Sequence, residues 1–274
     1  PNVVNELLRA KDLSLGGARR ELTVFFADVR GFTELTDVSQ EKVAEYVRQH
    51  GLTGDAAEAC FARQAGETLA TVNLYLALVA DTVIKHDGTL DKYIGDCVMA
   101  FWGAPAPTER HAAACVRAAV EAQRAVFDLN LRRAEENKLI EIENARLAAA
   151  GTPLQPLRPL LQLGSGINTG VVTVGLMGSE KHIRNYTVFG REVNLASRLE
   201  SVSGRGRIVI SEATYQHLRR DDPALAQSCI ALPPVTVKGI RAAVSIYEVP
   251  WRMPEQVGDG AQPASSAGSG TPVR

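Results

Sequence analysis

The sequence has no excess of charge of either sign, because 30 Lys and Arg residues stand against 31 Asp and Glu residues, a net charge of −1. Binding to nucleic-acid phosphates usually needs a clear basic excess, so this balance argues against a nucleic-acid partner. No long hydrophobic run is present: the longest, 74–80, ends at Asp81 and falls short of the roughly 18 apolar residues of a membrane span. The four cysteines form no CxxC pair, which favours buried thiols in a reducing, cytoplasmic compartment.

Both ends of the chain lack the pattern of a folded domain. Position 1 is Pro rather than Met and no signal peptide follows, so we expect a piece of a longer chain. Residues 1–19 place apolar side chains at helical spacing before a Gly-Gly pair. We interpret them as the end of a signalling helix from an upstream sensor or membrane region, with a passive tether as the alternative. Residues 252–274, rich in Gly, Pro, Ser and Ala, are expected to form a disordered tail.

The central part, with 45% apolar and 22% charged residues in the whole chain, has the composition of a globular domain. Short β-branched runs predict strands at 21–28, 89–94, 97–102, 161–176, 207–210, near 235, and at 244–249. Helical spacing predicts helices at about 69–86, 108–150, 192–202 and 211–218, with an extra helical insertion at about 38–68. Hairpins occur among the alternating elements, which favours an α+β fold over a doubly wound parallel sheet. The helix at 108–150 would be about 60 Å long and should project from the core.

Two aspartates lie at the ends of predicted strands. Asp28 ends the strand 21–28, and Asp96 lies in the turn between 89–94 and 97–102. Two carboxylates on adjacent strand ends form a hard-oxygen site suited to Mg²⁺ with a phosphate ligand. The backbone amides of Gly31, Phe32 and Thr33, at a helix N-terminus, would suit a triphosphate. An Asp beside a Gly in a turn is common without any function, so this pattern alone is weak evidence.

Four motifs in one order carry more weight than any single residue: FFADVRGFTELTD at 25–37, LDKYIGDCVMAFWGAP at 90–105, GINTGVVTVGLMGS at 166–179 and YTVFGREVNLASRLES at 186–201. Each closely resembles a signature of the class III nucleotidyl cyclase catalytic domain, and we assign 20–251 to that domain. The resemblance implies a ferredoxin-like βαββαβ core with a largely antiparallel sheet. It also implies a head-to-tail homodimer with active sites at the interface and two Mg²⁺ or Mn²⁺ ions per site.

The resemblance assigns roles to individual positions. Three of them match the metal ligands: Asp28, Val29 through its carbonyl, and Asp96. Four match positions that hold the triphosphate: Gly31, Phe32, Thr33 and Lys238. Asn194 and Arg198 match the catalytic pair that orients the ribose and stabilises the reacting phosphate. A guanidinium supplies planar donors where charge grows on a phosphate, which suits that role.

Two further positions bear on the choice of purine. Lys92 falls where adenylate cyclases carry Lys and typical guanylate cyclases carry Glu, and Thr187 falls on the second purine-selecting position. The combination resembles the Thr-type adenylate cyclase branch. An ammonium can donate to adenine N1, whereas guanine N1 carries a hydrogen, so the wrong purine would leave polar groups unpaired. The sequence therefore predicts an adenylate cyclase that converts ATP to 3′,5′-cyclic AMP and pyrophosphate in signal transduction.

Each of these residues also has a plain structural explanation. Asn194 and Arg198 lie one helical turn apart and could form a solvated face, and Lys92 could protect a strand edge from aggregation. Four histidines show no metal-ligand spacing and are expected to be structural or exposed: His86, His111, His182 and His217. The alternative functions are a non-catalytic regulatory or dimerisation module and a guanylate cyclase. Degenerate modules usually lose a metal aspartate or the Asn–Arg pair, and this chain has both.

Overall fold

The structure is a computed structural model that describes residues 17–252 apart from 151, 153, 180, 181, 183 and 241. Its strands are β1 (Ala18–Arg30), β2 (Thr89–Ile94), β3 (Cys97–Trp102), β4 (Gln162–Gly178), β5 (Arg184–Phe189), β6 (Arg207–Ser211), β7 (Ile230–Val235) and β8 (Val244–Glu248). Its helices are α2 (Phe32–Gln49), α3 (Asp55–Lys85), α4 (His111–Ala149), α5 (Arg191–Ser203), α6 (Glu212–Asp221) and α7 (Pro223–Ser228). The upstream helix and the tail expected from the sequence fall on residues 1–16 and 253–274, outside the described residues.

All eight described strands belong to one sheet, in the order β2-β3-β1-β4-β6-β8-β7, with β5 paired to β4. Every pair is antiparallel except β4 with β6, which is parallel. This confirms the predicted α+β fold with a largely antiparallel sheet. Strand β5 and helix α7 were not predicted, and β1 begins at Ala18, within the segment assigned to the upstream helix.

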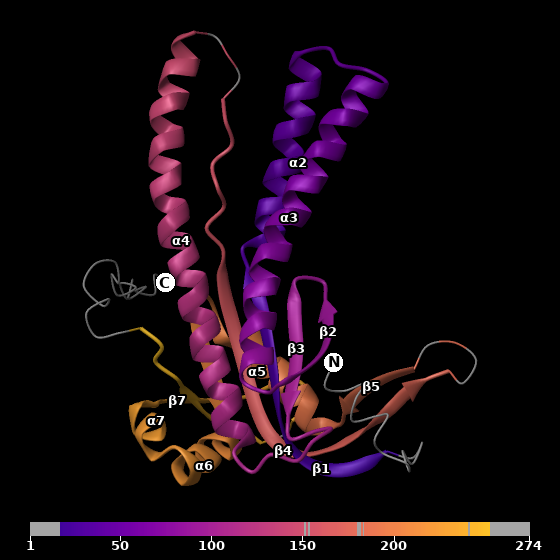
Figure 1. The fold of residues 1–274 in the computed structure, drawn as a ribbon, viewed down its shortest axis with the longest axis vertical. Coiled ribbons are helices and arrows are strands. Elements are labelled where there is room, and N and C mark those ends of the chain that lie inside the picture. The colour runs from indigo at the N-terminus through magenta and orange to yellow at the C-terminus, as the bar shows by residue number, and fades with distance from the viewer. Residues whose placement is uncertain are drawn as a thin grey trace, which may run out of the picture.

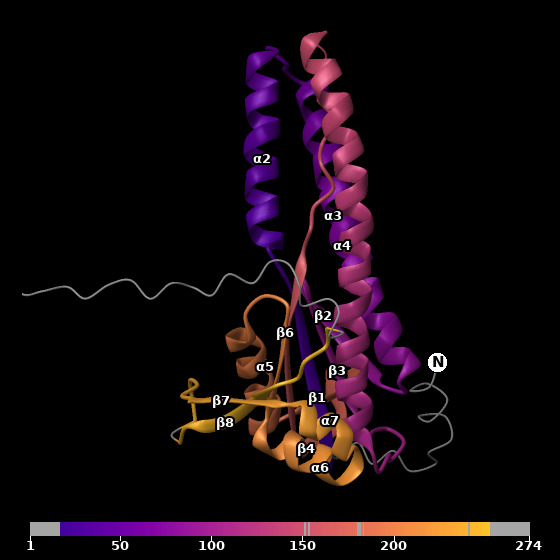
Figure 2. The same cartoon turned by 90° about the vertical axis from the view of Figure 1, so that its left-hand side faces the viewer.

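Side chains of β1 point alternately to the two faces of the sheet and so belong to two separate layers of the core. Phe25, Ala27 and Val29 pack on the face covered by α3, α4 and α6. Val24 and Phe26 pack on the opposite face, beneath α5. In Figure 2, α4 and α5 lie on opposite sides of the sheet. Because side chains alternate along a strand, the polar residues at the end of β1 are also divided between these two faces.

Helix α5 approaches the sheet closely at Gly166 of β4. A Cβ atom at this position would overlap the backbone nitrogen of Glu200 and the backbone oxygen of Ala196. Only glycine lets the helix lie directly on the strand, since any side chain would push it outward. The helix that carries Asn194 and Arg198 is therefore fixed against the sheet by backbone contact.

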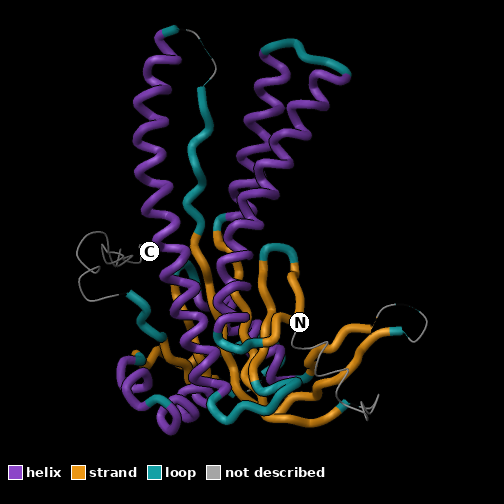
Figure 3. Tube along the Cα trace, in the orientation of Figure 1, coloured by secondary structure: helices purple, strands orange, loops and turns teal. Residues whose placement is uncertain are grey.

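The insertion expected at 38–68 is not a separate element, because it lengthens the two helices that flank it. Helices α2 and α3 form a hairpin whose turn contains Gly51 and Gly54, both at positive φ (58° and 55°). The segment contains no Pro, and its Ala, Glu and Gln residues favour helix, so each helix continues through it. The hairpin and α4 project beyond the same end of the sheet (Figures 1 and 3).

Helix α3 is the one described helix that is long and apolar enough, by length and composition, to cross a membrane. The core helix of a globular protein can pass the same test, so this is weak evidence. Its second half is such a core helix, because Tyr75, Val79 and Val83 are fully buried against the sheet and α4.

Helix α4 has 39 residues, close to its predicted range, and the chain then returns along it in an extended segment, 154–161 (Figure 3). Three asparagines, each seven positions from the next, bind the backbone of this segment: Asn130 to Leu161, Asn137 to Arg158 and Asn144 to Gln155. Asn137 and Asn144 each both donate and accept. Seven helical residues advance about 10.5 Å and three extended residues about 10 Å, so the spacings match.

Candidate active site

The two candidate metal aspartates lie side by side at the end of β1. Asp28 is paired with Cys97 of β3 in the sheet register, and the amide of Val29 donates to the carbonyl of Asp96 at 3.2 Å. Burial and the nearby Asp96 charge raise the pKa of Asp28, and Arg30 opposes this. Two carboxylates that repel each other in a half-buried position fit a divalent cation, whose preferred ligands are hard oxygens. This places all three sequence-predicted metal ligands in one cluster.

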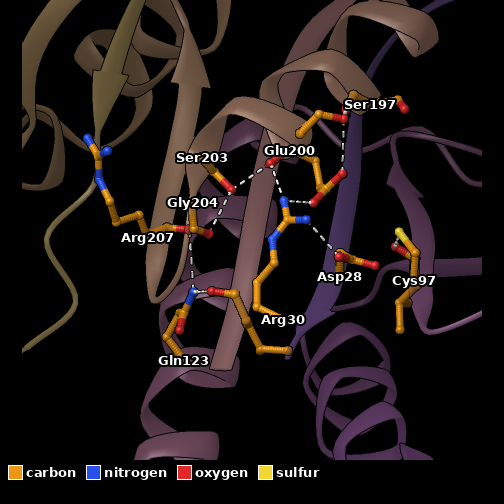
Figure 4. Close-up of polar contacts among 12 residues, drawn as sticks. Asp28, Arg30, Cys97, Gln123, Ser197, Glu200, Ser203, Gly204 and Arg207 are labelled. Carbon is orange, nitrogen blue, oxygen red and sulfur yellow. Dashed lines mark hydrogen bonds and ion pairs between the residues drawn. The ribbon is translucent and has the colours of Figure 1, made fainter. Parts of the chain in front are cut away.

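Arg30 connects this cluster to α5, as Figure 4 shows. Its NH1 group donates to Oδ2 of Asp28 at 2.9 Å. Its NH2 group donates to the backbone oxygen of Glu200 at 2.8 Å and forms a short contact with Oε1 of the same residue. Burial raises the pKa of Glu200 to about 7, although the Arg30 charge lowers it. The position of Asp28 is thus coupled through Arg30 to the helix that carries Asn194 and Arg198.

The N-terminus of α2 opens next to the aspartate pair. Gly31 precedes the helix with φ of 89°, a left-handed conformation that glycine adopts without strain, and no described side chain caps the first turn. The amides of Phe32 and Thr33 are therefore available to an anion. A cleft of about 380 Å³ lies beside this turn and is lined in part by Gly31, Arg30 and Arg205.

The two purine-selecting residues predicted from the sequence are in contact. Nζ of Lys92 donates to Oγ1 of Thr187 at 3.2 Å, and this hydroxyl donates to Oδ2 of Asp91 at 2.6 Å. Thr187 is 1% exposed, as is the Asp91 side chain, whereas Lys92 is 37% exposed. A register shift between Leu90 and Lys92 marks a β-bulge at Asp91. A bulge breaks the alternation of a strand, and here two consecutive side chains reach the same partner.

Burial dominates the electrostatics of Asp91. It raises the pKa of this carboxyl, while the hydrogen bond from Thr187 and the charge of Lys92 lower it. Its Oδ1 atom has no hydrogen-bond partner among the described residues, and Lys92 Nζ lies 3.6 Å away. The Thr187 hydroxyl and the Lys92 ammonium therefore together stabilise this buried carboxylate, and both side chains are held beside it.

The remaining predicted residues face solvent. Asn194 and Arg198 are exposed on α5, and neither side chain bonds to any residue that the structure describes. Lys238 is exposed in the turn between β7 and β8. Its neighbour Val237 is buried with Leu195 of α5, so the turn is anchored to that helix. Among described residues, no hydrogen bond or ion pair joins the aspartate pair to Lys92, Thr187, Asn194 or Arg198.

Sequence reasoning missed three residues of these clusters: Arg30, Asp91 and Glu200. All three lie inside the quoted motifs, at positions next to or two residues from a predicted site residue. Each is a charged residue within a segment that is otherwise largely apolar, and this was the one feature of the sequence that could have identified them. Their partners, however, come from distant parts of the chain.

Comparison with known proteins places these motifs in one family. The family model described as the adenylate and guanylate cyclase catalytic domain matches residues 17–249. Adenylate cyclase 1 of Rhizobium meliloti is 28% identical over 232 residues, which are 84% of this chain and 28% of that protein. The adenylate cyclase of Anabaena cylindrica is 27% identical over 242 residues, which are 87% of this chain and 39% of that protein. The chain thus spans well under half the length of these relatives.

Solved structures of two cyclases share the fold. The crystal structure of the adenylyl cyclase CyaB from P. aeruginosa is 32% identical with a TM-score of 0.58, and the match covers 87% of this chain and 97% of that one. The crystal structure of the guanylyl cyclase Cya2 is 30% identical with a TM-score of 0.58, and the match covers 85% and 93%. The family match, the shared fold and the clustered aspartates agree. The chain belongs to the adenylate and guanylate cyclase catalytic domain family.

Proposed function

We propose that this domain is an adenylate cyclase, which converts ATP to 3′,5′-cyclic AMP and pyrophosphate. The observation that carries the choice of ATP is the Lys92–Thr187–Asp91 group. Lys92 only donates, which suits adenine N1, an acceptor. The Thr187 hydrogen is directed to Asp91 and one lone pair of its oxygen accepts from Lys92, so the second lone pair remains to accept from the 6-amino group. Guanine presents the reverse pattern, with a hydrogen on N1 and an acceptor at position 6, and would leave buried polar groups unpaired.

The chemistry proposed is an in-line attack of the ribose 3′-hydroxyl on the α-phosphorus. A new P–O bond forms, the bond to the β-phosphate oxygen breaks, and the hydroxyl proton is released as pyrophosphate leaves. Two Mg²⁺ or Mn²⁺ ions held by Asp28, Asp96 and the Val29 carbonyl would lower the pKa of the hydroxyl and neutralise the triphosphate.

The protein's own groups orient the nucleotide and stabilise charge. Asn194 positions the ribose, and Arg198 donates to the α-phosphate oxygens, where negative charge accumulates. Lys238 and the amides of Gly31, Phe32 and Thr33 hold the terminal phosphates.

We infer that the working form is a homodimer with two equivalent composite sites. Among the described residues, the exposed Asn194 and Arg198 side chains have no hydrogen-bond or ion-pair partner, and no such bond joins the aspartate pair to Lys92 or Thr187. In a two-fold symmetric dimer each subunit presents the same surface to the other. The aspartates of each subunit can then face the purine and ribose residues of its partner, which forms two equivalent sites. No second protein is required.

We further propose that the domain is the output module of a longer cytoplasmic signalling chain, with a sensor or membrane region upstream. Support comes from the lengths of the relatives, of which this chain spans 28% and 39%. Similarity at about 30% does not choose between purines, because one solved relative is an adenylyl and another a guanylyl cyclase. The purine assignment therefore rests on side-chain chemistry.

A product assay tests the proposal. Purified dimer is incubated with ATP or GTP, each with Mg²⁺ or Mn²⁺, and the cyclic nucleotides are separated by chromatography. We expect cyclic AMP and pyrophosphate in equal amounts from ATP, and a much lower rate from GTP. Predominant formation of cyclic GMP from GTP would make the domain a guanylate cyclase, and no product from a folded dimer with either metal would make it a regulatory module.

A further inference from the structure

Three metal-binding side chains meet at the opposite end of β1 from the aspartate pair. Glu21 of β1, His111 at the start of α4 and His217 of α6 each offer a ligand atom within 4.8 Å of the others. Nε2 of His217 lies 3.7 Å from Oε1 of Glu21, and the two imidazole rings are 5.2 Å apart between centroids. The sequence spacing of these histidines gave no sign of a metal site. The fold brings them together from three separate elements.

This cluster is separate from the cyclase site. Glu21 and Asp28 are seven positions apart on β1, a distance of about 23 Å along an extended strand. Glu21 and Thr23 share the face of β1 that carries α4 and α6, while Asp28 continues the alternate set that packs beneath α5. The two clusters therefore lie at different ends and on different faces of the same strand.

His111 is oriented by a buried network, as metal-ligating histidines usually are. Its Nδ1 atom lies 2.7 Å from Oγ1 of Thr23, which lies 2.8 Å from Oγ1 of Thr169. Thr169 in turn lies 3.0 Å from the hydroxyl of Thr214, so the network continues across the core. Nε2 is the ring nitrogen left for a ligand. Burial, and then the neighbouring His217, lower the pKa of His111.

We propose that Glu21, His111 and His217 bind a transition-metal ion of the Zn²⁺ class. Two imidazoles and one carboxylate form a ligand set that Zn²⁺ accepts and that Mg²⁺, which prefers oxygen, does not. A cavity of about 1060 Å³ is lined in part by Glu21 and His111 and offers space for a fourth ligand such as water. An ion there would join β1, α4 and α6 at the base of the sheet.

Arg220 competes with the metal for His217. Its NH2 group is 3.0 Å from Nδ1 of His217, and it pairs with Asp221 through Nε at 2.7 Å. An arginine only donates, so Nδ1 accepts and the imidazole hydrogen lies on Nε2, toward Glu21. Metal on Nε2 moves that hydrogen to Nδ1 and obliges Arg220 to turn away, which its 62% exposed side chain can do. Loss of Arg220 should therefore tighten metal binding.

Zn²⁺ binding to the intact 274-residue chain tests the site. Titration against a chromophoric chelator, in millimolar Mg²⁺ to saturate the aspartate pair, should show one Zn²⁺ per chain with a Kd below about 1 µM. His217→Ala should weaken binding about 100-fold, and Glu21→Gln, at an exposed position, about 10-fold. His86→Ala is the matched control, because His86 and Glu121 form a two-residue pair at 2.8 Å without a third ligand. It should bind like the wild type.

Two further measurements test the role of Arg220 and the link between Zn²⁺ binding and stability. Arg220→Ala should tighten binding about 3- to 10-fold, because it removes both a competing donor and a cation. Saturating Zn²⁺ should raise Tm by about 5 °C in the wild type and not in His217→Ala. Equal Zn²⁺ affinity in the wild type and His217→Ala, or no binding by the wild type, overturns the proposal. Weaker binding by Arg220→Ala would contradict the competition between Arg220 and the metal for His217.

Discussion

Lys92 Nζ donates to Thr187 Oγ1 at 3.2 Å, although β2 and β5 are not neighbours in the sheet. The two residues that we propose to select the purine therefore lie on one subunit. On this proposal a single chain would recognise the purine, whichever chain supplies the metal ligands. The buried carboxylate of Asp91 orders this pair by accepting the Thr187 hydrogen and lying beside the ammonium.

Lys92→Glu should lower kcat/KM for ATP by about 100-fold or more. The substitution removes the donor to adenine N1 and places a second carboxylate beside Asp91, where like charges repel. The kinetics of cyclic AMP formation measure the effect. Lys138→Glu is the matched control, because Lys138 is exposed on α4 and its one ion pair among the described residues is with Glu135. An unchanged rate in Lys92→Glu would remove Lys92 from purine recognition.

Asp91→Asn should weaken discrimination between ATP and GTP by about 10-fold. The amide can turn either its oxygen or its nitrogen to Thr187, so the hydroxyl is no longer held as an acceptor. The change should raise KM for ATP more than it lowers kcat, because Asp91 contacts the two residues proposed to bind the purine and makes no bond to the described residues proposed to bind the phosphates. Asp87→Asn controls for the loss of charge, since Asn tolerates the positive φ (58°) of that residue. If the ratio of kcat/KM for ATP to kcat/KM for GTP is the same in Asp91→Asn and in the wild type, Asp91 has no part in purine discrimination.

Asp96→Asn and Arg198→Ala should each abolish turnover, and a mixture of the two should regain about one quarter of wild-type activity. Random exchange makes half of the dimers mixed, and each mixed dimer has one intact site out of two. Mass spectrometry of intact dimers confirms exchange, and cyclic AMP production measures the rescue. If exchange occurs without rescue, the active site is contained within one chain.

Glu200 should make the metal-free domain less stable as the pH rises from about 4.5 to 7. Its carboxyl has a pKa of about 7 in the folded chain, above the ordinary 4.5, so the folded state holds the extra proton in this window. The contribution of Glu200 to the free energy of unfolding is fully present below pH 4.5, its ordinary pKa. It is lost as the pH rises through about 7, its pKa in the folded chain. We expect a loss of about 1–2 kcal/mol, less than the full shift implies, since Arg30 and solvent screen the charge.

Denaturant unfolding in chelator at several pH values measures this loss. Glu200→Gln removes the titration and should flatten the difference between pH 5 and pH 8, while other groups titrate as before. If the variant and the wild type show the same pH slope, Glu200 is ionised throughout and its pKa is not raised.

Local chemistry explains what could be predicted from the sequence. The hairpin around Gly95 and Asp96 follows from two β-branched runs with a turn between them, and the structure has it at the predicted residues. The long helix after position 108 follows from uninterrupted helical spacing without Gly or Pro. The cluster of Asp28 with Asp96 required only that two adjacent strands end together.

Long-range pairing explains what could not be predicted. The contact of Arg30 with Glu200, the bulge at Asp91 and strand β5 all depend on partners far along the chain. Helical propensity in 38–68 was visible, but nothing local indicated that this segment would merge with both neighbouring helices. The meeting of His111 with His217 likewise arises only when α4 and α6 pack on one face.

The asparagine spacing in α4 restricts how the projecting part of the domain can change in length during evolution. Asn130, Asn137 and Asn144 stay in register with the returning segment because seven helical residues advance as far as three extended ones. An insertion of one residue in the helix would rotate everything beyond it by about 100° and turn the next asparagine away. Homologous chains should therefore gain or lose length here in coupled steps of about seven and three residues, or only beyond Asn144 at the tip.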